Sequence, residues 1–168
     1  MDIRLLPRDT RCLVDSNVFV YHLGSKGGDC TAFFDRVAGK EIEAYITTTI
    51  IAEVLHRQML VEAVLKGRIT PGKSLNKLKD NPEIITGLTD YITEVGKLLE
   101  LPIRIITVQP DDITCSHDLR RAHGLFVNDS INLACAQRFG LSDIATHDAD
   151  FRRVPDLRLW EPTDIRPQ

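Results

Sequence analysis

Short apolar runs alternate along the chain with longer stretches in which apolar side chains recur every three or four residues. The first run, residues 11–15, is apolar except at its ends and closes with the carboxylate of Asp15, which is typical of a strand buried on both faces. Similar runs predict strands over residues 42–47, 102–108 and 143–146, and a shorter run over 157–160 would add a fifth.

The intervening stretches predict helices. We expect the chain to turn at Ser16 and Asn17 and then to form a helix around residues 31–39. Residues 47–49 offer hydroxyl caps for a helix with an apolar stripe from Ile51 to Met59, ending at Gly67 and Pro71-Gly72. Further helices are predicted over residues 73–79, 82–99, 111–123 and 128–139.

This alternation of strands and helices defines the fold class. It implies crossover units and a mostly parallel sheet of four or five strands between two layers of helices. No internal repeat, linker or low-complexity tract divides the chain. We therefore predict one three-layer α/β/α domain over residues 1–168.

Composition narrows the class of protein. The chain has 168 residues, of which 43% are hydrophobic and 27% charged, as in one globular domain. No apolar run approaches the roughly 18 residues that a membrane helix needs, and the first residues lack a secretion signal, so we expect a cytoplasmic protein without membrane contact. The four cysteines form no Cys-x-x-Cys pair, which argues against a zinc ribbon.

The charge is uneven along the chain. The net charge is −3, whereas nucleic-acid-binding proteins usually carry a net positive charge. Residues 52–79 nevertheless contain six cations and only two acids, so excess acid gathers elsewhere.

Four acids follow or neighbour the predicted strands. Asp15 closes the first strand, Glu53 falls in the first turn of the helix after the second strand, and Asp148 follows the fourth strand. Asp129 opens the helix before that strand and joins them if its helix packs beside the first strand. Ligands of open parallel sheets bind at this carboxyl edge. Carboxylates that lie close together repel one another, which raises the pKa of each, and a divalent cation bound among them removes this repulsion. Oxygen ligands without histidine or cysteine suit Mg²⁺ or Mn²⁺. Helix N-termini at Glu53 and Asp129 would keep both groups ionised.

Each acid also has a purely structural interpretation. Asp15 could cap a turn with help from Asn17, and Asp129 could be an N-cap. Glu53 could be a solvated surface glutamate, and both Asp148 and Asp150 could be turn residues. The metal-site hypothesis rests on the convergence of all of them at one sheet edge.

Four sequence boxes resemble those of the PIN-domain nucleases, and among these the VapC-type toxins of toxin–antitoxin operons. They are Leu-Val-Asp-Ser-Asn-Val-Phe from residue 13, Thr-Thr-Ile-Ile-Ala-Glu from residue 48, Asn-Asp-Ser-Ile-Asn-Leu-Ala from residue 128, and Thr-His-Asp-Ala-Asp-Phe from residue 146. The resemblance spans residues 13–160 and places the family's four acids at Asp15, Glu53, Asp129 and Asp148, with Asp150 able to share the last role.

The resemblance implies a PIN-like fold and Mg²⁺-dependent (or Mn²⁺-dependent) cleavage of single-stranded RNA, in which a bound cation makes hydroxide available near neutral pH. It implies Asp15 and Asp129 as principal metal ligands, with Asp148 completing the site and Glu53 binding metal or orienting water. Ser16 and Asn17 would support them by hydrogen bonds. Candidate phosphate contacts are Arg57, Arg120, Arg121, Arg152 and Arg153. A VapC-like protein would be held inactive by a small antitoxin and would often form a homodimer.

Other functions remain open at this stage. The chain could be a housekeeping nuclease of the same family or a catalytically silent RNA-binding domain. A phosphatase of the haloacid-dehalogenase class needs an aspartate where Asn17 stands, receiver domains expect an acidic pair well before Asp15, and no phosphate-binding glycine loop occurs.

Residues 62–101 are longer than the corresponding stretch of compact VapC-type toxins. We expect this segment to form an extra helical lid, to alter a dimer, or to mark a family member that is not a toxin.

Overall fold

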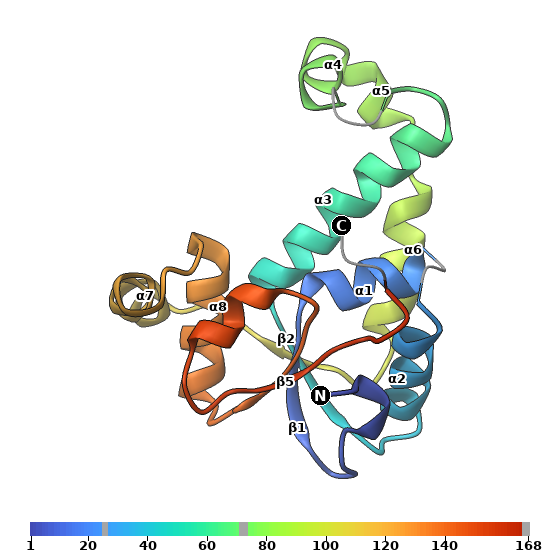
Figure 1. Ribbon diagram of the computed structural model, residues 1–168. Helices are drawn as coiled ribbons and strands as arrows, with labels where there is room; N and C mark the ends of the chain where they lie inside the picture. Colours follow the sequence, from blue (N-terminus) through green and yellow to red (C-terminus); the bar gives the residue numbers. More distant parts are fainter. Residues whose placement is uncertain (25–26, 71–73, 166–168) are drawn as a thin grey trace.

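Five parallel strands form one central sheet (Figure 1) in the computed structural model, which describes residues 1–24, 27–70 and 74–165. Their order across the sheet is β3-β2-β1-β4-β5. The strands are β1 (Arg11–Val14), β2 (Glu43–Thr47), β3 (Arg104–Ile106), β4 (Asp143–Ala145) and β5 (Arg158–Trp160). All five predicted strands are therefore confirmed, with the third shorter than expected.

Helices cover both faces of the sheet. Helices α7 (Pro110–His123) and α8 (Val127–Arg138) lie on one side, and α1 (Ser16–Leu23), α2 (Gly28–Ala38) and α6 (Asp90–Leu99) on the other (Figure 1). The remaining elements are α3 (Thr48–Leu65), α4 (Ser74–Asp80), α5 (Pro82–Thr86) and the 3₁₀-helices η1 (Ile3–Leu5) and η2 (Ala149–Arg153). The predicted three-layer α/β/α fold is confirmed.

The strand order places a topological switch point at the carboxyl ends of β1 and β4, hereafter the β1–β4 crevice. The chain leaves β1 through α1 toward β2 and β3, then returns over the other face through α7 and α8 to β4. Adjacent strands whose connections diverge leave an opening at their carboxyl ends, where ligands of such sheets bind. Val14 pairs with Ala145 at this point, so Asp15 and Thr146 emerge side by side.

The core holds the strands from both faces, as their apolar runs predict. Residues 12–14 of β1 and 143–145 of β4 are buried throughout. On one face, Phe19 and Phe34 bring α1 and α2 together, with ring centroids 4.9 Å apart. The cysteines within the core are free thiols. None of the described helices is long and apolar enough to cross a lipid bilayer.

The predictions for two segments were wrong. Ser16 and Asn17 begin α1 instead of a turn, because the Asp15 carboxylate caps the helix by accepting a hydrogen bond from the Ser16 amide. Residues 82–99 form two helices, α5 and α6, because the chain breaks at Gly87 and buries Leu88. The predicted helix end at Pro71-Gly72 and the predicted start at Lys73 lie outside the described residues.

The first part of the long segment 62–101, through α5, forms an arm that projects from the sheet (Figure 1), whereas α6 returns to the main core, where Val95 and Leu98 are buried. The far half of α3 packs against α6, and α4 and α5 lie at the tip. A small second core built from Ala63, Ile69, Leu78 and Leu88 stabilises it. Because Leu65 lies about 18 Å along α3 from Glu53, the described arm extends away from the acids rather than over them as a lid.

Candidate active site

Asp15 is held at the end of β1 by three hydrogen bonds. Its carboxylate accepts from the Ser16 amide at 2.7 Å, from Asn17 Nδ2 at 2.6 Å and from Thr146 Oγ1 at 2.6 Å. The side chain is buried, with 7% of the residue exposed. Asp15 therefore has one fixed orientation at the crevice.

Thr146 connects the two strands of the crevice, a role that the sequence interpretation did not assign. Its hydroxyl donates to Asp15 and accepts from Asn17 Nδ2 at 3.1 Å and from the Asp148 amide at 2.9 Å. One buried hydroxyl thus orients the segments that carry two of the acids. Its position at the head of the fourth box is the only sequence signal for it.

Glu53 reaches the same edge from α3. It lies in the second turn of that helix, not the first as predicted, because Thr47 is the N-cap and its Oγ1 accepts from the Ile50 amide. Glu53 Oε1 accepts a 2.8 Å hydrogen bond from Ser16 Oγ and lies 3.7 Å from Arg57 Nε. Ser16 therefore ties α3 to α1 beside Asp15.

Asp148 and Asp150 differ in their contacts. Asp148 caps η2 by accepting from the Asp150 amide at 2.8 Å. Asp150 instead forms a 2.6 Å ion pair with Arg153. Asp148 is among the charges that raise the pKa of both Asp15 and Asp129, whereas Asp150 is among those that raise the pKa of Asp129.

Asp129 lies on α8, in the helical layer on the face of the sheet opposite to α1. It is the third residue of α8, whose N-cap is Phe126, so it is not the N-cap itself. The helix is anchored by Asn132, whose Oδ1 accepts from Thr47 Oγ1 and Thr49 Oγ1, both at 2.7 Å. This contact joins α8, which carries Asp129, to the start of α3, which carries Glu53.

Burial and neighbouring carboxylates raise the pKa of both central acids, Asp15 and Asp129. Burial raises the pKa of Asp15 to about 6, against its hydrogen bonds from Thr146 and Ser16, and the charges of Glu53 and Asp148 add to the rise. Burial raises the pKa of Asp129 to about 7, followed by the charges of Asp15, Asp148, Glu53 and Asp150. The expectation that the helix N-terminus keeps Asp129 ionised was therefore wrong, because burial and like charges outweigh the helix dipole.

The other buried acids of the described chain behave in the opposite way. Each has partners that outweigh its burial and lower its pKa: Asp29 with Thr163, Glu62 with Lys66, Asp112 with Arg138, and Asp143 with Arg158 and Trp160. Asp15 also accepts three hydrogen bonds, but burial and the neighbouring acids outweigh them, and burial and neighbouring acids likewise raise the pKa of Asp129. Raised pKa values of this kind are typical of functional sites.

The donor set fits a hard divalent cation. All four acids present carboxylate oxygens, and a cation among them would remove the repulsion that raises the pKa of Asp15 and Asp129. Within residues 1–24, 27–70 and 74–165, no three acidic, histidine or cysteine side chains are already arranged to hold one metal ion.

The five arginines predicted to contact phosphate are placed differently. Arg57 and Arg153 pair with site acids, Glu53 and Asp150. Arg152 pairs with Glu161, and Arg120 donates to Ser116 and Ser130 between α7 and α8. Arg121 is exposed in the last turn of α7. Arg57 and Arg153 are thus the members of this set that reach the acid edge through a contact.

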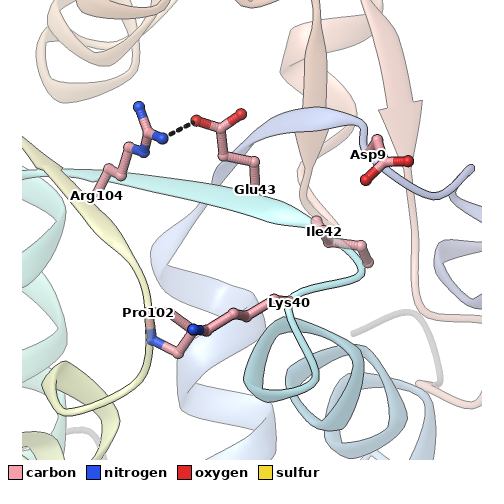
Figure 2. Close-up of a pocket in the computed structure, with 6 residues that line it drawn as sticks. All are labelled: Asp9, Lys40, Ile42, Glu43, Pro102 and Arg104. Atoms are coloured by element: carbon pink, nitrogen blue, oxygen red, sulfur yellow. Dashed lines mark ion pairs between the residues drawn. The ribbon is translucent and has the colours of Figure 1, made fainter.

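A pocket of about 330 Å³ lies at the other edge of the sheet, where β2 and β3 begin (Figure 2). Its lining includes Glu43 and Arg104, which form a 2.7 Å ion pair, together with Asp9 and Lys40. None of the candidate acids lines this pocket. It is a feature separate from the acid edge.

Comparison with known proteins identifies the family. The model of the PIN domain family matches residues 12–157, and the chain belongs to that family. A curated relative, ribonuclease VapC2 of Methanocaldococcus jannaschii, is 26% identical over 159 residues, covering 94% of this chain and 98% of the relative.

Solved structures show the same fold. VapBC2 of Rickettsia felis, bound to a DNA fragment from its promoter, matches with a TM-score of 0.60 at 17% identity, covering 91% of this chain and 99% of that chain. VapC20 of Mycobacterium tuberculosis, a toxin that cleaves the sarcin–ricin loop, matches with a TM-score of 0.56 at 12% identity, covering 93% and 99%. The predicted family is confirmed.

Proposed function

We propose that the protein is a metal-dependent endoribonuclease that cleaves single-stranded or loop RNA with four catalytic acids: Asp15, Glu53, Asp129 and Asp148. The observation that carries this proposal is the gathering of these acids at the β1–β4 crevice, where the charges of Glu53 and Asp148 raise the pKa of both Asp15 and Asp129, and the charge of Asp15 adds to the rise at Asp129. The similarity to ribonuclease VapC2 over most of both chains supports it.

Each acid has a distinct task in this proposal. Asp15 and Asp129 are the principal ligands for Mg²⁺ or Mn²⁺, Asp148 completes the ligand set, and Glu53 binds metal or orients the attacking water. When bound, the cation supplies water of lowered pKa and positive charge for the leaving 3′ oxygen. Asn17 and Thr146 hold the Asp15 carboxylate in place, and Ser16 does the same for Glu53.

The protein is further proposed to be the toxin of a VapBC-type pair, restrained by a small antitoxin and acting as a homodimer. Solved structures with this fold include VapBC2 of Rickettsia felis and a toxin–antitoxin complex from Klebsiella pneumoniae, the latter with a TM-score of 0.52 at 18% identity. Coexpression with the protein encoded by the adjacent reading frame tests this: a toxin is copurified and inhibited by it, whereas a housekeeping nuclease is not.

The cleavage proposal is tested with purified protein and a structured RNA pool. Cleavage should stop in EDTA and return with Mg²⁺ or Mn²⁺. Asp15→Asn and Asp129→Asn should each lower the rate by about 100-fold or more while circular dichroism stays native. Asp118→Asn, an exposed acid on α7, is the matched control and should cleave at the wild-type rate. Undiminished cleavage by both site variants would refute the assignment.

A further inference from the structure

Phe126 is an exposed aromatic side chain at the turn between α7 and α8. It is 73% exposed, whereas the preceding Leu125 is buried at 5%. A single exposed apolar residue is ordinary on protein surfaces, so exposure alone assigns nothing. The position of Phe126 relative to the acids is what indicates a role for this side chain.

The chain on either side of Phe126 connects its turn to the acid edge. Phe126 is the N-cap of α8, and Asp129 follows three residues later, about one helical turn away. On its other side, Gly124 O accepts a 2.9 Å hydrogen bond from Arg153, which also pairs with Asp150. The turn is thus tied both to the helix of Asp129 and to the 3₁₀-helix that follows Asp148.

Two arginines lie on elements next to this turn. Arg153 remains half-exposed while it bridges the turn and Asp150, and Arg121 is exposed in the last turn of α7. Aromatic rings beside arginine or lysine are typical of surfaces that bind single-stranded nucleic acid, because bases stack on the ring while cations meet the phosphates. A paired strand keeps its bases stacked on one another and offers no free base face to Phe126.

We propose that Phe126 stacks on one unpaired base of the RNA, close to the phosphate held at the acid edge. The inference rests on the proposed ribonuclease function and deepens it, since it makes an unpaired base a requirement of the substrate. Phe126 is a substrate-positioning residue, which acts on binding and not on the chemical step.

Substitution and base removal together test the contact. Phe126→Ala should lower kcat/KM on single-stranded RNA by about 10-fold, chiefly through KM, and Phe126→Trp should stay within about threefold of wild type. Phe126→Leu keeps apolar bulk without a flat ring and should resemble Phe126→Ala. In a series of RNAs that each carry one abasic site, we expect one position at which loss of the base lowers kcat/KM of the wild type by about 10-fold, the same factor as Phe126→Ala. Loss of the base at that position should not lower kcat/KM of Phe126→Ala any further.

Leu5→Ala is the matched control, because Leu5 is 72% exposed on η1, outside the acid edge. The stacking proposal is overturned if Phe126→Ala keeps the wild-type KM, if its abasic profile equals that of wild type, or if Phe126→Leu restores full activity. A loss of activity that accompanies a change of oligomeric state in light scattering also overturns it, since Phe126 would then be a protein contact. If wild type cleaves no RNA, the ribonuclease proposal fails, and fluorescence anisotropy with the same oligonucleotides decides the Phe126 contact separately.

Discussion

The hydroxyl of Thr146 donates a 2.6 Å hydrogen bond to the carboxylate of Asp15 across the β1–β4 crevice. The same oxygen accepts from Asn17 and from the Asp148 amide, so its one hydrogen and both lone pairs are used. This arrangement couples the orientation of two acids from distant parts of the sequence. It also favours the ionised form of Asp15, which burial opposes.

Thr146→Val should therefore raise the pKa of Asp15 above its present value of about 6. We expect kcat to fall by about 10-fold or more, as for other partners of metal-binding residues, and the acidic limb of the pH–rate profile to move to higher pH. Thr146→Ser keeps the hydroxyl and should retain most of the activity. An unshifted acidic limb in Thr146→Val would show that this hydrogen bond does not control Asp15.

Asp129→Asn should stabilise the metal-free protein near neutral pH. Because the pKa of Asp129 rises from 3.8 to about 7 on folding, the folded state binds the extra proton between these values, and the wild type loses stability as pH rises from about 4 to 7. At pH 7.5 the variant should be more stable by on the order of 1–3 kcal/mol, a rise in melting temperature of several degrees. The difference should vanish near pH 4. Calorimetry across this range in EDTA measures it, and a variant less stable than wild type at pH 7.5 would mark Asp129 as a structural acid.

The strands and the identity of the acids follow from local sequence, because apolar runs and strand-end carboxylates are short-range signals. The sequence also predicts that Asp15 and Asp148 share an edge, since parallel strands end on the same side. It does not show what surrounds each acid. Thr146 and Asn132 act through partners more than 80 residues away in the chain, which no local pattern reveals.

The errors have similar causes. Residues 16–23 contain several strand-favouring side chains, and α1 forms because Asp15 caps it and Phe19 is buried in the core. The break between α5 and α6 follows from burial of Leu88 in the second core, which depends on α3. The protonation of Asp129 was mispredicted because the helix dipole is visible in the sequence, whereas burial is not.

Thr49 offers a selective test of how α8 is positioned. Its hydroxyl contacts only Thr47 Oγ1 at 2.8 Å and Asn132 Oδ1 at 2.7 Å within the described chain. Thr49→Val keeps the shape and removes the contact, so we expect kcat to fall by about 10-fold with little change in KM, because displacement of Asp129 affects chemistry more than RNA binding. Thr49→Ser should restore the rate. Equal kcat in the two variants would mean that this contact does not position α8.

Glu62 should stabilise the arm without affecting catalysis. Its buried carboxylate accepts from the Thr89 amide at 3.1 Å, the Tyr91 amide at 2.8 Å and Lys66 at 2.6 Å, and these donors outweigh burial and lower its pKa to about 2. This stabilisation is complete above the ordinary pKa of about 4.5 and is lost as pH falls toward 2. At pH 7, Glu62→Gln should cost about 1–3 kcal/mol and speed hydrogen exchange at the amides that begin α6.

The matched control for Glu62 is Glu83→Gln, an exposed carboxylate on α5 that should change neither exchange nor stability. The rate of RNA cleavage by Glu62→Gln should stay at the wild-type value, because Glu62 lies about 13 Å along α3 from Glu53. Normal exchange with a reduced cleavage rate would reverse this assignment and make the arm part of the catalytic apparatus. Faster exchange with unchanged cleavage would assign Glu62 to the stability of the fold and separate it from the acids of the reaction.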